Sequence, residues 1–195
     1  MPDMIQDGRG TGERAGVDSR GRLTVTSESS SLQHVISREE RQAFQIIGTA
    51  TLAAGAVVVL HGKNNHTSKD MVFTYIRHQV LDHSGGTALP NASNYFRLAL
   101  NRTRSSGGAA VTPVQLFANA GEVSQTTWYD TAPTLAGTAA EFDRWYTKAE
   151  GDMHSFNKEG TVIVPPNGTI EAAYVGDQSS GTVYCRMSFI MTGSG

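Results

Sequence analysis

The six histidines are the residues of this sequence best suited to metal chemistry. A cupin-like metal site takes two histidines two positions apart on one strand, because alternate side chains share a face. No H-x-H pair occurs in the sequence. His61 and His66, like His78 and His83, are five positions apart on predicted strand ends and loops, where that spacing does not place two rings on one face. The sequence therefore predicts no metal and no cofactor.

Closely spaced acids are the next candidates, since two carboxylates can share acid–base work on a sugar. Glu141 and Asp143 are two positions apart, as are Glu150 and Asp152. The first pair lies at a predicted helix start, where acids favour the helix dipole, and Asp152 belongs to a turn. Asp18-Ser19 lies in a segment too flexible to hold a catalytic triad. We expect no catalytic residue and no enzymatic activity.

Aromatic side chains concentrate between residues 126 and 147. They are Trp128, Tyr129, Trp145 and Tyr146. Such rings stack on sugars in lectin-like sites, but more often they anchor a core or a subunit interface. We interpret them as anchors and keep carbohydrate binding as the alternative.

Composition excludes several classes of protein. The chain has 195 residues, of which 17% are charged, 38% are hydrophobic and 21 are Gly, a blend typical of turn-rich β proteins. The net charge of −2 gives no basic footprint for nucleic acid or an anionic membrane. No apolar run reaches the roughly 18 residues of a membrane span, and from Met1-Pro2-Asp3 onward we expect no signal peptide. The single Cys185 excludes an internal disulfide, and we expect it to be buried.

The elements that must position any site are strands, and the C-terminal one is the clearest. Between residues 182 and 192 the apolar residues alternate with a mostly polar set, which predicts one buried and one solvated face. The apolar members are Val183, Cys185, Met187, Phe189 and Met191. Upstream, Pro165-Pro166-Asn167-Gly168 predicts a turn, because Pro cannot donate to a ladder and Asn-Gly accepts positive φ. This turn separates strands at 161–164 and 169–175.

Further strands follow one another closely from residue 42 onward. We expect them at 43–52, 56–63, 70–81, 95–102, 109–117 and 126–129. In the third, unbroken alternation sets Val72, Thr74, Ile76 and His78 against Met71, Phe73, Tyr75 and Arg77. Ser105-Ser106-Gly107-Gly108 predicts a hairpin leading into the fifth strand. With the C-terminal strands the count is eight or nine, which indicates an all-β, jelly-roll-like β-sandwich over residues 41–195.

One segment has two interpretations. Thr138 to Glu141 matches a helix capping box, and Phe142, Trp145, Tyr146 and Ala149 then follow a helical spacing up to Gly151. These residues predict one short helix. A bulged strand through 144–147 is the competing interpretation.

Residues 1–40 differ from the rest, because they hold little to bury and cannot offset their ordering entropy alone. One interpretation is a flexible tail. The other is an extended N-terminal arm that adds to the sheet edge of a neighbouring subunit. The segment at 22–26 alternates like a strand, and five aliphatic residues favour the arm. These candidate partner-binding residues are Leu23, Val25, Leu32, Val35 and Ile36.

Three segments of the sequence carry a family resemblance when they are taken together: Val17 to Leu23, Asn94 to Leu100 and Val162 to Ile170. Together with the closing strand they resemble a class of tailed-bacteriophage structural proteins, the small β-sandwich virion proteins of podoviruses and siphoviruses. Members of that class decorate or cement the head or form the base of a head fibre. The resemblance covers most of residues 17–192 and carries no site residues.

The resemblance implies a non-enzymatic virion protein, most simply a head decoration or cement protein on the outer capsid surface, assembled in the host cytoplasm. Its expected partners are the major capsid protein or other virion proteins, and no nucleic acid or membrane. By analogy with three-fold head positions we expect a homo-oligomer, with a trimer favoured. The alternative is a receptor- or carbohydrate-binding module of a tail or head fibre.

Overall fold

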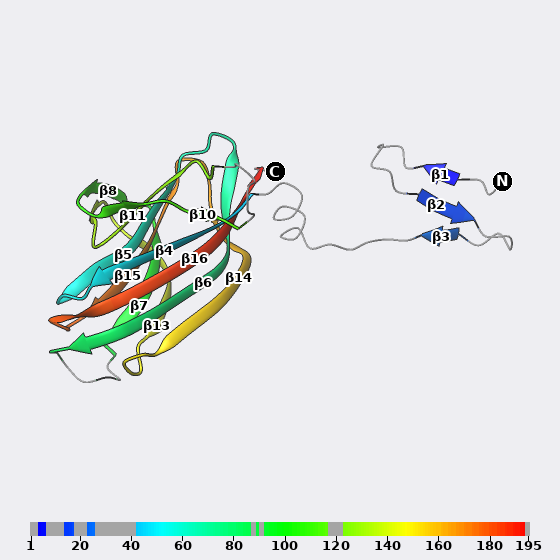
Figure 1. Ribbon diagram of the computed structural model, residues 1–195. Helices are drawn as coiled ribbons and strands as arrows, with labels where there is room; N and C mark the ends of the chain where they lie inside the picture. The colour runs from blue at the N-terminus through cyan, green and yellow to red at the C-terminus, as the bar shows by residue number, and fades with distance from the viewer. Residues whose placement is uncertain are drawn as a thin grey trace. The chain divides into compact units, whose positions relative to one another are not determined.

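A computed structural model gives the three-dimensional structure of the chain (Figure 1). It describes residues 4–6, 14–17, 23–25, 42–86, 89, 92–116 and 123–193. The chain divides into two compact units, Met1–Ser31 and Leu32–Gly195. Strands are the only regular elements among the described residues, and no helix occurs there. The all-β prediction is confirmed.

The first unit contains a three-stranded antiparallel sheet in the order β1-β2-β3. Its strands are β1 (Met4–Gln6), β2 (Arg14–Val17) and β3 (Leu23–Val25). β3 pairs with β2 and lies at one edge of this sheet. Within the alternating segment, residues 23–25 are therefore a strand, which pairs with β2 of the same unit.

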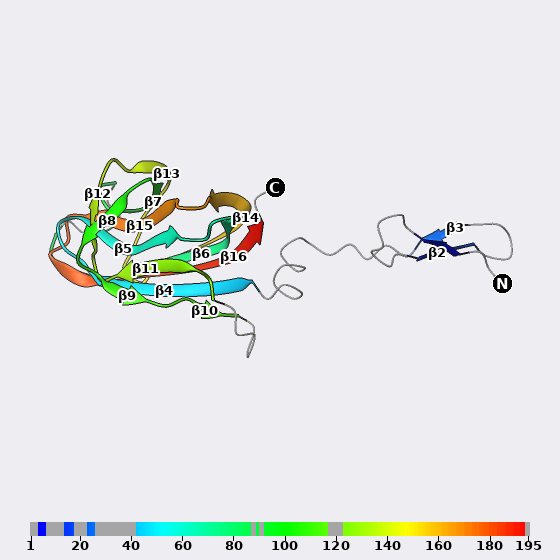
Figure 2. The same ribbon diagram turned by 90° about the horizontal axis from the view of Figure 1, so that it is seen from above.

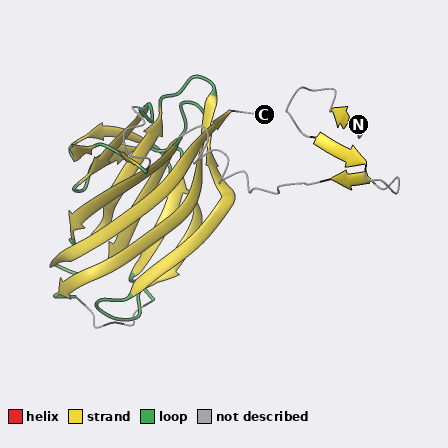
Figure 3. Cartoon of the chain, turned by 45° about the vertical axis from the view of Figure 1, so that its right-hand side comes forward, coloured by secondary structure: helices red, strands yellow, loops and turns green. Residues whose placement is uncertain are grey.

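Five antiparallel strands form the first sheet of the second unit, in the order β10-β4-β16-β6-β14. Their bounds are Ala43–Thr51 for β4, Lys69–Ser84 for β6, Val114–Gln115 for β10, Met153–Val164 for β14 and Ser180–Gly193 for β16. β16 lies at the centre, between β4 and β6. Figures 1 and 3 show the four long strands of this sheet running side by side.

Six antiparallel strands form the second sheet, in the order β13-β7-β15-β5-β11-β9. Their bounds are Gly55–Asn64 for β5, Tyr95–Leu100 for β7, Ala109–Val111 for β9, Thr126–Asp130 for β11, Ala140–Tyr146 for β13 and Thr169–Gly176 for β15. A separate pair joins β8 (Thr103–Ser106) to β12 (Thr134–Ala136). In Figure 2, β4 and β10 lie on one side of the body and β7 and β13 on the other.

The core lies between these two sheets. All five apolar residues of the β16 alternation have 0% of their surface exposed, so the predicted inward face is confirmed. The ring of Phe189 contacts Phe44 and Phe73 of its own sheet and Trp128 of the other, with centroids 5.6, 5.8 and 5.6 Å away. Contacts of this kind across the interior hold the sheets together, because each aromatic side chain removes a large apolar area from water.

The turn between β14 and β15 forms as predicted. Asn167 has a φ of 63°, and the Gly168 amide donates to the Pro165 carbonyl at 2.9 Å. The fully buried Asn64 stabilises the same end of the body, since its Nδ2 donates to the Val164 carbonyl at 3.0 Å and to the Lys69 carbonyl at 2.8 Å. One side chain thereby ties the ends of β5, β6 and β14 together.

The predicted helix near residue 140 is wrong. Residues 140–146 form β13, an edge strand that pairs with β7 and carries a bulge between Glu141 and Asp143. This agrees with the competing bulged-strand interpretation. A bulge leaves one residue without a partner, so it disturbs the two-residue period and makes the apolar spacing look helical. The open edge of β7 supplies the main-chain hydrogen bonds that a helix would have made internally.

The predicted hairpin at residues 105–108 is also wrong, although both of its glycines have positive φ. Gly107 and Gly108 have φ values of 67° and 72°, as a tight turn requires. The strands on either side do not pair with each other, since β8 pairs with β12 and β9 with β11. The strand expected at 109–117 is split at Pro113 into β9 and β10, which belong to different sheets. Proline has no N–H to give to a ladder.

Alternation along β6 is interrupted at Thr74. Its neighbours Tyr75 and Phe73 face Ser188 and Phe189 of β16, which are consecutive, so Thr74 is an extra residue. Phe73 and Ile76 are consequently both buried in the core. The predicted unbroken alternation, which puts these two residues on opposite faces, is therefore wrong.

Candidate functional site

A buried ion group lies on the outer face of the six-stranded sheet. The Glu171 side chain on β15 is only 1% exposed, and its Oε1 lies 3.0 Å from an Arg97 guanidinium nitrogen. Arg102 lies 3.2 Å from Oε2 and also donates to the Leu135 carbonyl of β12 at 3.0 Å. Two cations therefore serve one carboxylate, and the group is a fixed structural charge rather than a free acid or base. The only indication of this ion group in the sequence is that Glu171 is the single charged residue of the strand Thr169–Gly176.

His61 on β5 lies beside this ion group and is 3% exposed. Its Nε2 donates to the Arg102 carbonyl, 2.9 Å away, because a carbonyl oxygen can only accept. Burial lowers the pKa of His61, an effect that the Arg102 carbonyl and Glu171 oppose. The neutral ring then carries a lone pair on Nδ1, and this buried atom has no hydrogen-bond partner. His61 is thus an unused acceptor.

A groove of about 300 Å³ opens next to His61. It is lined by His61, Lys63, Thr103, Arg104, Thr127, Tyr129 and Thr169, which come from β5, β8, β11 and β15. The Arg104 guanidinium lies over the Tyr129 ring, 3.8 Å from its centroid, and its Nε donates to the Gly107 carbonyl at 2.7 Å. Among the described residues, no carboxylate lines the groove. Among the described residues, this groove is our candidate for a binding site.

An aromatic cluster, defined as His78, Phe96, Trp145, His154 and Phe156, lies where β13 and β14 approach each other. The His78 ring stacks on Phe96 with centroids 3.9 Å apart, and Trp145 stacks on Phe156 at 4.1 Å. Burial and the neighbouring His154 lower the pKa of His78 to about 3, opposed by Asp152. His154 itself contacts Asp152 at 2.8 Å. Within the described parts of the chain, no three His, Cys, Asp or Glu side chains are grouped so as to hold a metal ion.

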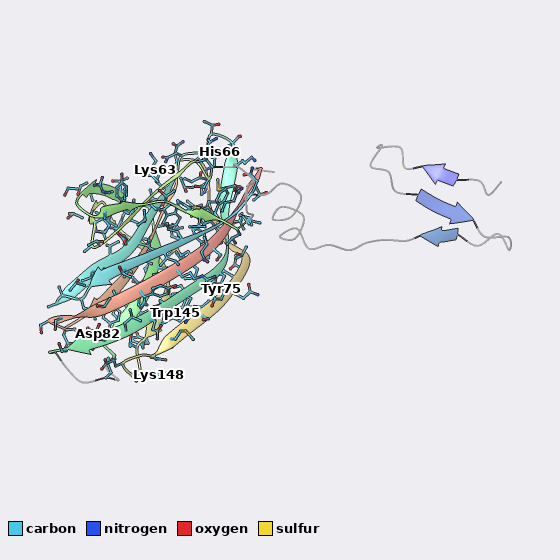
Figure 4. All side chains as sticks on the ribbon, viewed as in Figure 1. Lys63, His66, Tyr75, Asp82, Trp145 and Lys148 are labelled. Carbon is cyan, nitrogen blue, oxygen red and sulfur yellow. The ribbon has the colours of Figure 1, made fainter. Side chains whose placement is uncertain are left out.

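The four aromatic residues considered for sugar stacking do not form one surface. Trp128 is 1% exposed and belongs to the core, while Tyr129 lies in the groove. Trp145 belongs to the aromatic cluster. Tyr146 is 49% exposed on β13, an edge strand that three strands separate from β11 in the same sheet. In Figure 4, the labelled Lys63 of the groove and Trp145 of the aromatic cluster lie in different parts of the body.

The acids at the start of β13 do not face each other. The Glu141 carboxylate accepts from Arg144 at 2.6 Å, whereas Asp143 binds Lys158 of β14 at 2.5 Å. Each carboxylate has its own cation, so the two cannot act as an acid–base pair across a shared substrate.

The outer face of the five-stranded sheet carries a second concentration of positive charge. Arg77 on β6 and Arg186 on β16 are directly opposite each other. Among the described residues neither forms an ion pair, and the Nε atoms of both are buried without a partner. The exposed Ile47 and the Tyr75 ring, which lies 6.0 Å from the Arg186 guanidinium, border them. Like charges directly opposite are unfavourable, so this face suits contact with an anionic surface.

The candidate partner-binding residues of the N-terminal segment are only partly described. Leu23 and Val25 lie in β3, where they pair with Val17 and Ala15 of β2. Leu32, Val35 and Ile36 lie outside the described residues. The binding role of all five, and a boundary near residue 40, stay predictions.

No protein-family model matches the chain, and no curated protein matches its sequence. In the described part of the chain, no helix has the length and apolar character needed to span a bilayer.

Proposed function

We propose that the body is a jelly roll, and the order of its strands supports this. Eight of the strands described in the second unit have six or more residues: β4, β5, β6, β7, β13, β14, β15 and β16. The first, eighth, third and sixth of them are neighbours in one sheet, as β4-β16-β6-β14. The second, seventh, fourth and fifth are neighbours in the other, as β5-β15-β7-β13. Two interleaved Greek keys produce this order in a jelly roll.

We infer from this fold a non-enzymatic structural protein of a phage virion, a head decoration or cement protein bound to the outer capsid surface. The jelly-roll order is the observation that carries the proposal, because viral capsid domains, lectins and cupins use this fold. The interior argues against the last of these. Phe44, Phe73, Phe189 and Trp128 occupy the space between the sheets, where a cupin holds its metal.

Attachment to the capsid would use the N-terminal arm, the sheet edges and the arginine face. β14 and β10 are edge strands of the five-stranded sheet, and edge strands have main-chain groups free for an added strand. Arg77 and Arg186 are suited to a partner surface that carries carboxylates, because arginine forms two parallel hydrogen bonds with such a group. The same surfaces would join copies of the chain into a homo-oligomer, with a trimer expected at three-fold head positions.

Deletion of residues 1–36 tests the proposal. The truncated protein should keep the melting transition of the intact chain and lose co-sedimentation with heads that lack the native copy. A matched variant, Leu23→Asp with Val25→Asp, keeps the arm's length and should lose binding equally if the arm adds as a strand. Full retention of the truncated protein on heads would assign attachment to the body. Failure of the intact protein to bind heads would contradict the decoration role itself.

A receptor- or carbohydrate-binding module of a tail or head fibre is the second candidate. The groove beside His61 favours it, because small-molecule sites are concave and combine an aromatic wall with a few convergent polar groups. A glycan array probed with the intact protein distinguishes the two candidates, since a pure cement protein should bind no glycan on it.

A further inference from the structure

The groove beside His61 concentrates positive charge, separately from the Arg77 and Arg186 face. Lys63 and Arg104 line it, and among the described residues neither forms an ion pair. Glu171 does not neutralise them, because Arg97 and Arg102 already occupy its two oxygens. The whole chain carries a net charge of −2, so this positive region is local. A ligand with a negative group would enter it favourably.

Arg104 is held in place before any ligand arrives. Its plane lies on the Tyr129 ring, and its Nε is occupied by the Gly107 carbonyl. The terminal nitrogens of the guanidinium form no other hydrogen bond among the described residues. A preoriented guanidinium loses little side-chain entropy on binding and matches the geometry of a carboxylate, sulfate or phosphate.

The rest of the groove lining offers hydroxyl groups, which a bare anion would use only in part. Nδ1 of His61 takes no part, because this atom is buried and not accessible from the groove. Thr103, Thr127 and Thr169 add hydroxyl groups to the lining, and the Thr127 hydroxyl already accepts from Asn65 at 2.5 Å. A threonine hydroxyl can both donate to and accept from a ligand hydroxyl. The groove lining therefore suits a ligand that carries both an anionic group and hydroxyl groups.

We propose that this groove binds a sugar bearing an acidic group, with the anion held by Lys63 and Arg104 and the sugar hydroxyls by the threonines. The volume of about 300 Å³ is at the lower end of small-molecule sites and suits one or two sugar rings. A carboxylated, a sulfated and a phosphorylated sugar present the same chemistry to these residues. Such groups are common to acidic polysaccharides, and the inference holds on a head protein or on a fibre module alike.

Titration calorimetry on the full-length protein tests the proposal with defined probes. The probes are galacturonic acid, a sulfated galactose, a phosphorylated galactose, neutral galactose, and inorganic sulfate and phosphate. At least one acidic sugar should bind about tenfold more tightly than neutral galactose and about tenfold more tightly than the inorganic anions. The comparison among the three acidic sugars identifies the source of the anionic group.

Variants then place the binding in this groove. Arg104→Gln and Lys63→Gln should each weaken binding of the acidic sugar about tenfold, while their melting temperatures stay at that of the parent. Arg144→Gln is the matched control, because Arg144 is another exposed arginine that lies over a tyrosine ring, 4.1 Å from the Tyr95 centroid, on the opposite edge strand β13. It should leave the affinity unchanged.

Four results would overturn the proposal. They are no binding of any acidic sugar, equal binding of neutral galactose, equal binding of inorganic sulfate or phosphate (an adventitious ion only), and an affinity that Arg104→Gln does not reduce. Binding of neutral glycans alone on the array would support the carbohydrate-binding module and still refute the acidic-sugar groove. Binding to heads is unaffected by any of these results, so failure here is distinct from failure of the decoration role.

Discussion

Replacing Phe189 with alanine should destabilise the body severely, because this ring connects the two sheets. Phe189 is fully buried near the middle of β16. It contacts Phe44 on β4, Phe73 on β6 and Trp128 on β11, with centroid distances between 5.6 and 5.8 Å. Its removal leaves a cavity bordered by three large rings on two sheets, which cannot collapse without moving a strand.

The expected loss can be estimated from these contacts. Phenylalanine-to-alanine changes in cores cost about 3–5 kcal/mol. Each aromatic pair contributes about 0.5–1.5 kcal/mol beyond buried area, and Phe189 loses three pairs, so we expect the upper part of this range, about 4–5 kcal/mol. For a chain of this size, 1 kcal/mol corresponds to about 2–4 °C, so the melting temperature should fall by about 8–20 °C.

Urea and thermal unfolding followed by circular dichroism measure this loss. Phe142→Ala is the control, because Phe142 is 41% exposed on β13 and should lose less than about 1 kcal/mol. Phe189→Leu, which keeps most of the volume, should fall between the two. If Phe189→Ala unfolds at the same urea concentration as the parent, Phe189 is not a core residue and the inward face of β16 is assigned backwards.

Three further predictions concern buried polar groups. Glu171→Gln should destabilise the protein by about 3 kcal/mol in urea unfolding, because it leaves two guanidinium groups without their carboxylate. Glu141→Gln breaks an exposed pair and should cost at most about 1 kcal/mol. Equal losses of stability in the two variants would refute the distinction between the buried and the exposed pair. The pKa of about 3 for His78 in the folded protein lies below its value in the unfolded chain, so the unfolded state binds the proton first. The free energy of unfolding should therefore fall as pH drops from 6.5 toward 3, and the loss should be about 2 kcal/mol at pH 5. His78→Phe should remove that part of the slope, and an unchanged slope would assign it to other groups. Burial raises the pKa of the Cys185 thiol, so a thiol reagent should modify Cys185 only as fast as the protein unfolds. Fast labelling of the native protein would contradict the burial of Cys185.

The sequence by itself determined the features that depend on neighbours along the chain. The two-residue period of β16 sets which side chains are buried, because the pleat alternates faces whatever the partner strand is. The turn before β15 follows from Pro165 and from the positive φ of Asn167, which are local backbone properties. The burial of Cys185 is a consequence of the same alternation.

The tertiary structure decided what depends on pairing between distant segments. Thr74 becomes an extra residue only because β16 supplies two consecutive partners where β6 has three residues, and the burial of Ile76 follows from that. Likewise, β13 is a strand because the edge of β7 is available to it. A local pattern cannot report such an edge, since the capping box and the helical spacing near residue 140 are compatible with both outcomes.

The candidate site depends on distant pairing most of all. Glu171 is 74 residues from Arg97 and 69 from Arg102, and the groove joins side chains from four strands. Read singly, each of these residues is an ordinary polar residue on a strand or turn. Their common face exists only because β15 pairs with both β5 and β7, which places Glu171 opposite His61 on one side and Ala99 on the other. Chain connectivity within each strand fixes the alternation of faces, but only the register between strands fixes which charges meet.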